Sequence, residues 1–154
     1  VVPAAPELVT VMIHDLPTSD YYRAGVTRQG APALPDPTDT VRAYLAAMEA
    51  RDLDLARTML GDGFTMTFPG APAMKDLQEL IDWSRPRYHY VKKKYSGFDV
   101  SYGDKTVVYC HGTLQGEWPD GTEFGGVRFI DRFELTDGKI TRQDVWNDLG
   151  EVRP

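Results

Sequence analysis

Apolar and polar residues follow two different periods along this chain, helical in its first half and alternating in its second half. Over residues 37–49, apolar side chains recur at the spacing of one helix face: Val41, Tyr44, Leu45 and Met48. Asp36 can cap this helix, and Pro37 suits its first position. The pattern therefore predicts a helix that points Tyr44 toward the core.

Two shorter helices and one strand are predicted next. Asp52 is a second potential cap, and a short amphipathic stretch follows it. The segment FTMTF at residues 64–68 alternates as a strand does and stops at a Pro-Gly turn. Residues 77–84 again show helical spacing, so a third helix is expected there.

After residue 89, apolar and polar side chains alternate as they do in β-strands. Strands are expected near four segments, 90–101, 106–117, 123–135 and 139–148, with turn signals at YGDK, PDGT and TDGK. Helices followed by consecutive hairpins is an α+β order, in which helices cover one face of an antiparallel sheet. We expect one domain over residues 37–154 and a proline-rich arm over residues 1–36, with one edge strand near residues 8–13.

Composition and charge exclude several classes of protein. The chain has 154 residues, 42% of them hydrophobic and 26% charged, which suits one globular domain. No segment has the roughly 18 apolar residues that a membrane helix needs. The net charge of −6 argues against nucleic-acid binding. Cys110 is the only cysteine, so no internal disulfide forms. We expect a soluble, cytoplasmic protein without a membrane or nucleic-acid partner.

One basic segment departs from the acidic composition. Residues 85–95, RPRYHYVKKKY, place five cations among aromatic side chains: Arg85, Arg87, Lys92, Lys93 and Lys94. Such a mixture can stack single-stranded nucleic acid. In an acidic chain, a solvated strand whose lysines protect a sheet edge is the favoured interpretation.

A lone carboxylate stands on an apolar strand face in VRFIDRFELTDGKI, residues 127–140. Alternation places Asp131 on the same face as four apolar residues: Val127, Phe129, Phe133 and Leu135. A buried carboxylate needs a partner or a raised pKa. Asp131 is therefore our first candidate for a general acid or hydrogen-bond donor, with a structural aspartate paired to an arginine or a tyrosine as the alternative.

The segments from Tyr44 to Gly70 and FIDRFELTDGKI together resemble the nuclear transport factor 2-like superfamily, in particular its SnoaL-like and ketosteroid-isomerase-like members. The resemblance implies a cone-shaped curved antiparallel sheet wrapped around three N-terminal helices, with an apolar pocket inside. In ketosteroid isomerases, an aspartate and a tyrosine at the positions of Asp131 and Tyr44 donate hydrogen bonds to a developing oxyanion.

Two positions depart from enzymes of this superfamily. The general-base aspartate of the isomerases corresponds to Phe68, which cannot abstract a proton. The last-strand aspartate of limonene epoxide hydrolases corresponds to Val145. Both known activities are therefore disfavoured, although the pocket and its donors can serve other chemistry.

The remaining candidates surround this pair. His111 is a candidate general base, although either face of its strand can line the pocket. Asp144 is a second candidate base, because a one-residue shift in register decides whether it faces inward. The candidate substrate-binding residues are Phe64, Phe68, Trp83, Phe129, Phe133, Gln143 and Asn147. No metal-ligand spacing and no phosphate-binding loop is present.

These observations lead to one hypothesis and one alternative. The hypothesis is a cofactor-independent enzyme that isomerises, dehydrates or cyclises a small hydrophobic carbonyl compound. Asp131 and Tyr44 would stabilise an enolate-like oxygen, and His111 or a last-strand residue would move the proton. The alternative is a non-catalytic binding or oligomerisation domain of the same fold. A homodimer is expected in either case.

Overall fold

The computed structural model describes residues 34–154. The edge strand predicted near residues 8–13 and nearly all of the proline-rich arm lie outside this part of the chain. The division into an arm and a domain therefore stays a prediction.

The three predicted helices are present, and each begins at an aspartate. Helix α3 (Pro37–Glu49) starts after Asp36, whose carboxylate accepts from the Thr38 amide. Helix α4 (Leu53–Thr58) is capped by Asp52. Helix α5 (Leu77–Ser84) has a reciprocal capping box between Asp76 and Glu79. Each cap satisfies amides that a helix N-terminus leaves without partners, which explains why the helices begin where they do.

Five strands form one sheet in the order β1-β5-β4-β3-β2. They are β1 (Leu60–Thr67), β2 (Tyr90–Tyr102), β3 (Thr106–Glu117), β4 (Glu123–Thr136) and β5 (Lys139–Asn147). Strands β2 to β5 pair antiparallel as consecutive hairpins, and β1 pairs parallel to β5. The predicted Asp-Gly turn joins β4 to β5, with positive φ at both Asp137 and Gly138, as a two-residue hairpin of this type requires.

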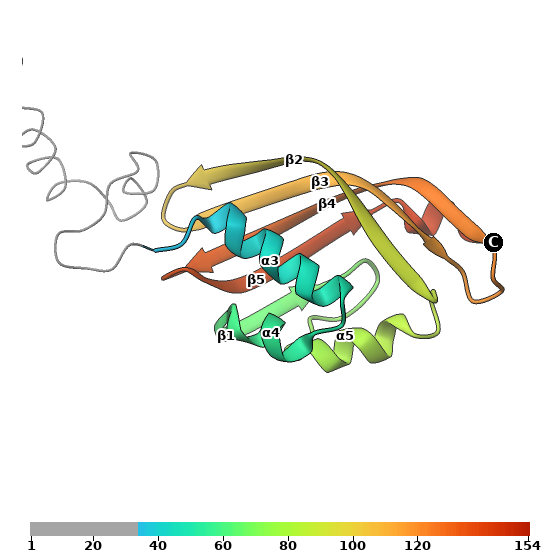
Figure 1. Cartoon of the computed structure of the whole chain (residues 1–154), viewed down its shortest axis with the longest axis horizontal. Helices are drawn as coiled ribbons and strands as arrows, with labels where there is room; N and C mark the ends of the chain where they lie inside the picture. The colour runs from blue at the N-terminus through green and yellow to red at the C-terminus, as the bar shows by residue number, and fades with distance from the viewer. Residues whose placement is uncertain (1–33) are drawn as a thin grey trace, which may run out of the picture.

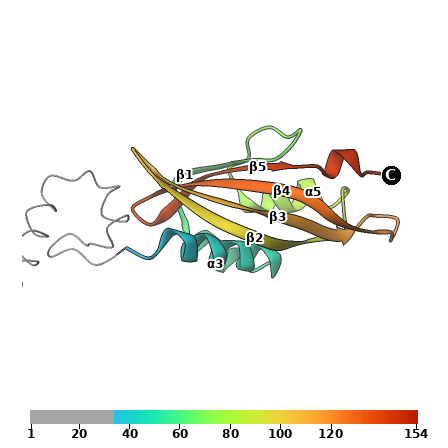
Figure 2. The same cartoon turned by 90° about the horizontal axis from the view of Figure 1, so that it is seen from above.

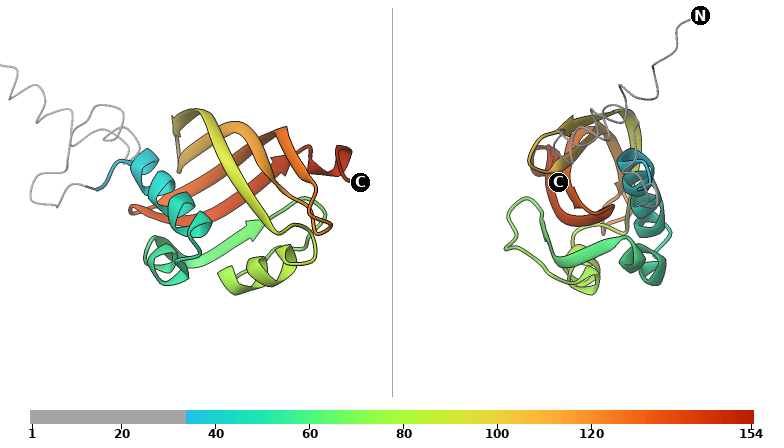
Figure 3. Two further views of the ribbon diagram at one scale, coloured as in Figure 1. Left: turned by 45° about the vertical axis from the view of Figure 1, so that its right-hand side comes forward. Right: turned by 90° about the vertical axis from the view of Figure 1, so that its left-hand side faces the viewer.

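The sheet is strongly curved, and the helices lie on its concave side. Helix α3 crosses the sheet in Figure 1, and α4 and α5 lie beside β1. From above, α3 lies against one face of the sheet (Figure 2). The end-on view in Figure 3 shows the strands curling around the space that the helices partly fill. This is the predicted α+β cone.

The core lies between α3 and the concave face of the sheet. Its fully buried residues include Val41 and Tyr44 from α3 and Val108, Phe133 and Ile140 from three strands. The inward-facing residues of β4 alternate with outward-facing ones, as predicted, so Asp131 is on the concave side and is fully buried.

A β-bulge interrupts the edge strand β2. Its pairing with β3 shifts between Tyr95 and Gly97, so that Ser96 is the extra residue. Before the bulge, Lys93 and Tyr95 pair with the inward-facing residues of β3, and after it Phe98 does so. Both halves of β2 therefore present side chains to the concave side. The alternation shifts by one residue at the bulge, so odd-numbered residues face inward before it and even-numbered residues after it.

Candidate functional site

A cavity of about 400 Å³ opens on the concave side of the sheet. Side chains from α3, from the segment after β1, from α5 and from four strands line it, so segments far apart in the chain meet there. Most of the wall is apolar and aromatic. A mainly apolar cavity with a few converging polar groups is typical of a small-molecule site.

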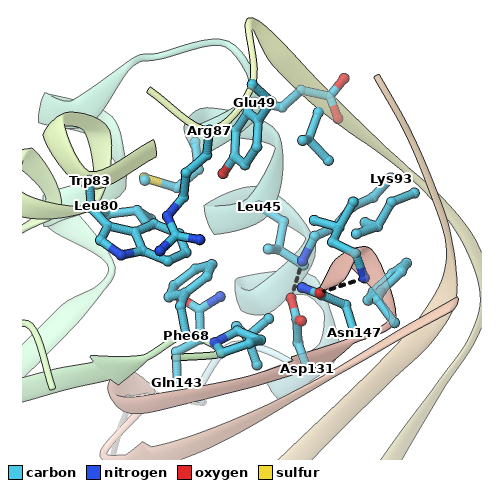
Figure 4. Close-up of a pocket in the computed structure, with 18 of the residues that line it drawn as sticks. Leu45, Glu49, Phe68, Leu80, Trp83, Arg87, Lys93, Asp131, Gln143 and Asn147 are labelled. Atoms are coloured by element: carbon cyan, nitrogen blue, oxygen red, sulfur yellow. Dashed lines mark hydrogen bonds and ion pairs between the residues drawn. The ribbon is translucent and has the colours of Figure 1, made fainter. Parts of the chain in front are cut away.

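Lys93 and Asp131 form an ion pair in the wall of this cavity. The Lys93 ammonium donates to Asp131 Oδ2, and the two side chains point toward each other in Figure 4. The Lys93 side chain is 19% exposed and the Asp131 side chain is not exposed at all. The ammonium also lies 4.6 Å from the centre of the Phe129 ring. The lysine thus has one carboxylate and one aromatic face as its neighbours.

The carboxyl group of Asp131 is only partly satisfied. Among residues 34–154, no group makes a hydrogen bond with Oδ1, which is buried. Burial raises the pKa of Asp131, because the charged form loses its hydration, and Lys93 opposes this rise. The side chain of Gln143 also favours the ionised form, although it does not reach Oδ1 in normal hydrogen-bond geometry. Asp131 is thus a carboxyl with raised proton affinity and a spare acceptor oxygen.

A second polar pair lies beside the first. The buried Tyr44 hydroxyl donates to Gln143 Oε1 at 3.0 Å. Burial raises the pKa of Tyr44, and the nearby charge of Asp131 raises it further, so the phenol is neutral. In this structure its proton is donated to Gln143, and direct donation from Tyr44 to a ligand stays a prediction. The structure brings Tyr44, Gln143, Asp131 and Lys93 together in one wall.

The predicted binding residues divide into two groups. Five of them line the cavity: Phe68, Trp83, Phe129, Gln143 and Asn147. Phe64 and Phe133 do not, since they pack edge-on against the Tyr44 ring, with ring centres 6.5 and 6.0 Å away, and belong to the core. Asn147 accepts from the Leu149 amide at 3.1 Å, which fixes its side chain at the end of β5.

Two predicted proton carriers are not at the cavity. His111 is exposed, because its neighbour Cys110 takes the inward position opposite Asp131. Asp144 lies on the outer side with Arg142 and Arg132, at 2.8 and 3.8 Å. The structure decides the two alternatives that the sequence left open: alternation puts Cys110 and Gln143 inward, and hence His111 and Asp144 outward, away from the cavity as proton carriers.

Lys93 is a site residue that the sequence prediction did not include. The prediction of a solvated sheet edge is correct for the exposed Lys92 and Lys94 and for the edge position of β2, but not for Lys93. The available signal was the two-residue period that places Lys93 on the same side as Val91 and Tyr95.

No cluster of three or more histidine, cysteine, aspartate or glutamate residues that could hold a metal ion occurs within residues 34–154. In the same part of the chain, no helix has the length and apolar character needed to cross a bilayer.

The chain belongs to the SnoaL-like domain family, whose model matches residues 41–143. The matched region runs from α3 into β5 and so contains Tyr44, Lys93, Asp131 and Gln143. A comparison with curated proteins gave no match.

Solved structures share the fold at low sequence identity. An NTF2-like protein of unknown function from Burkholderia pseudomallei is 18% identical, with a TM-score of 0.64, over 77% of this chain and 95% of that one. A protein described as a SnoaL-like polyketide cyclase from Jannaschia sp. is 21% identical, with a TM-score of 0.61, over 82% and 94% of the two chains. An LEH-like epoxide hydrolase of M. tuberculosis is 19% identical, with a TM-score of 0.59, over 77% and 87%. These likenesses establish the NTF2-like cone.

Proposed function

We propose that this protein is a cofactor-independent enzyme that moves a proton next to the carbonyl group of a small hydrophobic molecule, as an isomerase, dehydratase or cyclase does. The observation that carries the proposal is the buried Asp131, whose Oδ1 is without a hydrogen-bond partner among the described residues while Oδ2 is paired with Lys93. A structural carboxylate in an apolar wall is normally satisfied at both oxygens.

The pair supplies both groups that enolate chemistry needs. Asp131 Oδ1 can accept a proton from the carbon next to the carbonyl, and its raised pKa makes it a stronger base than an exposed carboxylate. The Lys93 ammonium can donate to the oxygen on which negative charge develops. In the return step, Asp131 gives the proton back to carbon and the carbonyl is restored. Tyr44 and Gln143 hold each other and thereby position the wall beside the carboxyl.

Proteins of the same fold support the coarser part of this proposal, an enzyme-like domain that holds a small molecule in the cone. Two similar structures are described as a polyketide cyclase and an epoxide hydrolase, and a third, TerC, was co-crystallised with polyporic acid. TerC is 16% identical with a TM-score of 0.63, over 75% of this chain and 93% of its own.

The test is deuterium exchange into 2-tetralone, an apolar ketone with acidic protons beside its carbonyl, followed by proton NMR in heavy water. We expect the protein to accelerate exchange, and Asp131→Asn and Lys93→Met each to lower the rate by about 100-fold. Lys94→Met is the matched control on the exposed side of the same strand and should exchange at the wild-type rate. Exchange no faster than the buffer background, or full activity in Asp131→Asn, would refute the mechanism.

A non-catalytic binding domain is the second candidate, and one observation favours it. Phe68 stands in the cavity wall at the position that the resemblance assigns to the isomerase base. Tight ligand binding without any exchange in 2-tetralone or in related ketones would favour this candidate.

The protein is also proposed to form a homodimer through the outer face of the sheet. Ile130 and Trp146 are paired neighbours on β4 and β5, 40% and 53% exposed, and His111 pairs with Ile130 on the other side. This row of three side chains, here called the outer patch, is exposed and partly apolar, which suits a symmetric contact with a second copy.

A further inference from the structure

Positive charge gathers around the cavity of an otherwise acidic protein. Four cationic side chains line it, Arg51, Arg87, Lys93 and Arg153, against the two carboxylates of Glu49 and Asp131. Lys93 is paired with Asp131. Within residues 34–154, none of the three arginines forms an ion pair. Although the chain has a net charge of −6, three arginines around one cavity have no acidic partner among the residues that the structure describes.

Of these arginines, Arg87 makes the contact that best suits holding a ligand. It follows α5, is half-buried, and its guanidinium lies 3.9 Å from the centre of the Trp83 ring, another wall residue. Figure 4 shows the side chain running along the wall toward Phe68. Stacking on an indole fixes the guanidinium plane and leaves its N–H edge available, which is the geometry that binds an oxyanion with two parallel hydrogen bonds.

Arg51 lies two residues after α3 and lines the same cavity. Its backbone has a positive φ of 61°, and its Nη1 donates to the Met48 carbonyl at 3.3 Å. Tyr88 is another wall residue; burial raises its pKa, and the charges of Arg51 and Arg87 oppose this rise. Two arginines from different segments therefore contribute to the wall of one cavity.

We propose that the ligand of this cavity is an amphipathic anion, with an apolar body carrying the reactive carbonyl and an oxyanion group, such as a carboxylate, bound by Arg87 and assisted by Arg51. This substrate class rests on the proposed function, because the carbonyl end is assigned to Lys93 and Asp131. The aromatic wall of Phe68 and Trp83 accepts the apolar body between the two polar ends. Binding the anionic end also orients the carbonyl toward the proton-transfer pair.

Two fluorescent probes of nearly identical shape test this assignment. 1-Anilinonaphthalene-8-sulfonate carries an oxyanion, and N-phenyl-1-naphthylamine has the same apolar body without it. Their dissociation constants are measured by fluorescence titration at one fixed ionic strength, because salt screens partly exposed charges. Arg87→Gln is expected to weaken sulfonate binding about tenfold, as for the loss of a charge-assisted hydrogen bond, and to change binding of the neutral probe less than about twofold.

Arg85→Gln is the matched control. Arg85 lies two residues earlier, is exposed, pairs with Asp82 at 3.7 Å and does not line the cavity. It should leave both dissociation constants unchanged. Equal effects of Arg87→Gln on the two probes, or no effect on either, would overturn the anion assignment while leaving the apolar cavity intact. Failure of the neutral probe to bind the wild-type protein would instead count against the cavity as a hydrophobic ligand site, and with it against both proposals.

Discussion

Strand β4 carries two buried carboxylates on opposite faces of the sheet, and their surroundings differ. On the outer face, Glu134 accepts from Lys105 at 2.7 Å and from Arg132 at 2.8 Å. The hydrogen bond from Lys105, helped by Arg132, holds the pKa of Glu134 below its usual value. On the concave face, Asp131 has one cation and one oxygen without a partner in the described part of the chain, and its pKa is raised.

The difference separates a structural carboxylate from a candidate functional one. Both residues come from one strand, so the strand alone does not set their properties. The outer face supplies two cations and contact with water, which favour the charged form. The cavity supplies one cation and little hydration, which leaves a proton-accepting oxygen in an apolar wall. Such a perturbed group in a cavity is a marker of function.

Removal of Lys93 should have the largest effect on the difference between the two carboxylates. In Lys93→Met the carboxyl of Asp131 is left buried without a cation, and we expect the free energy of unfolding at pH 7 to fall by about 3 kcal/mol. The folded-state pKa of Asp131 then lies further above its unfolded value. Since the folded state holds its proton more tightly, the loss should be largest at neutral pH and shrink as the pH falls toward the ordinary aspartate value of 3.8.

Chemical denaturation at several pH values measures this effect. Lys94→Met, on the exposed side of β2, should change stability by less than about 0.5 kcal/mol at every pH. The double variant Lys93→Met/Asp131→Asn should regain part of the lost stability. Its loss should no longer depend on pH, because the buried carboxyl is gone. A loss in Lys93→Met that stays constant with pH would contradict an unpaired carboxyl as its cause.

The outer patch allows a test of what covers the outer face. Ile130→Asp places a charge in the row formed with His111 and Trp146, and in a symmetric contact each charge would face the partner. We expect the dimer dissociation constant to rise at least about tenfold, measured by analytical ultracentrifugation. Ser101→Asp, at the exposed end of β2, is the control and should not change it. A wild-type monomer at micromolar concentration would refute the homodimer.

The smallest effect is expected at the outer carboxylate. Because the folded-state pKa of Glu134 is lowered, its pairing stabilises the protein above the ordinary value of 4.5, and this contribution disappears as the pH falls through the lowered value. Glu134→Gln should therefore cost less than about 1 kcal/mol at pH 7 and nothing in strong acid. Urea denaturation at the two pH values measures it. If the loss of stability in Glu134→Gln became larger as the pH fell, the predicted direction of the pH dependence would be wrong.

Local patterns predicted most of the fold. Helical spacing, with caps predicted at Asp36 and Asp52, located the three helices, and alternation located the five strands and predicted the burial of Asp131. Helical spacing directed Tyr44 toward the core, and the register of the resemblance made Gln143 and Asn147 binding candidates; all three line the cavity. Lys93 was not identified as a site residue and the facing of His111 was left open, because the strand face that lines a cavity depends on sheet curvature and on pairing with distant segments. Neither is encoded by the residues next to it.

The bulge at Ser96 has a consequence for how this chain can change in evolution. A substitution in β2 affects one side chain. Loss or gain of a single residue between Lys93 and Phe98 would instead turn all side chains in one half of the strand to the opposite face of the sheet. Either the ammonium would leave the cavity or Phe98 would leave the core. Relatives that keep the lysine are therefore expected to keep the spacing of five residues between it and the inward aromatic residue beyond the bulge, at the position of Phe98, even where the sequence between the two has diverged.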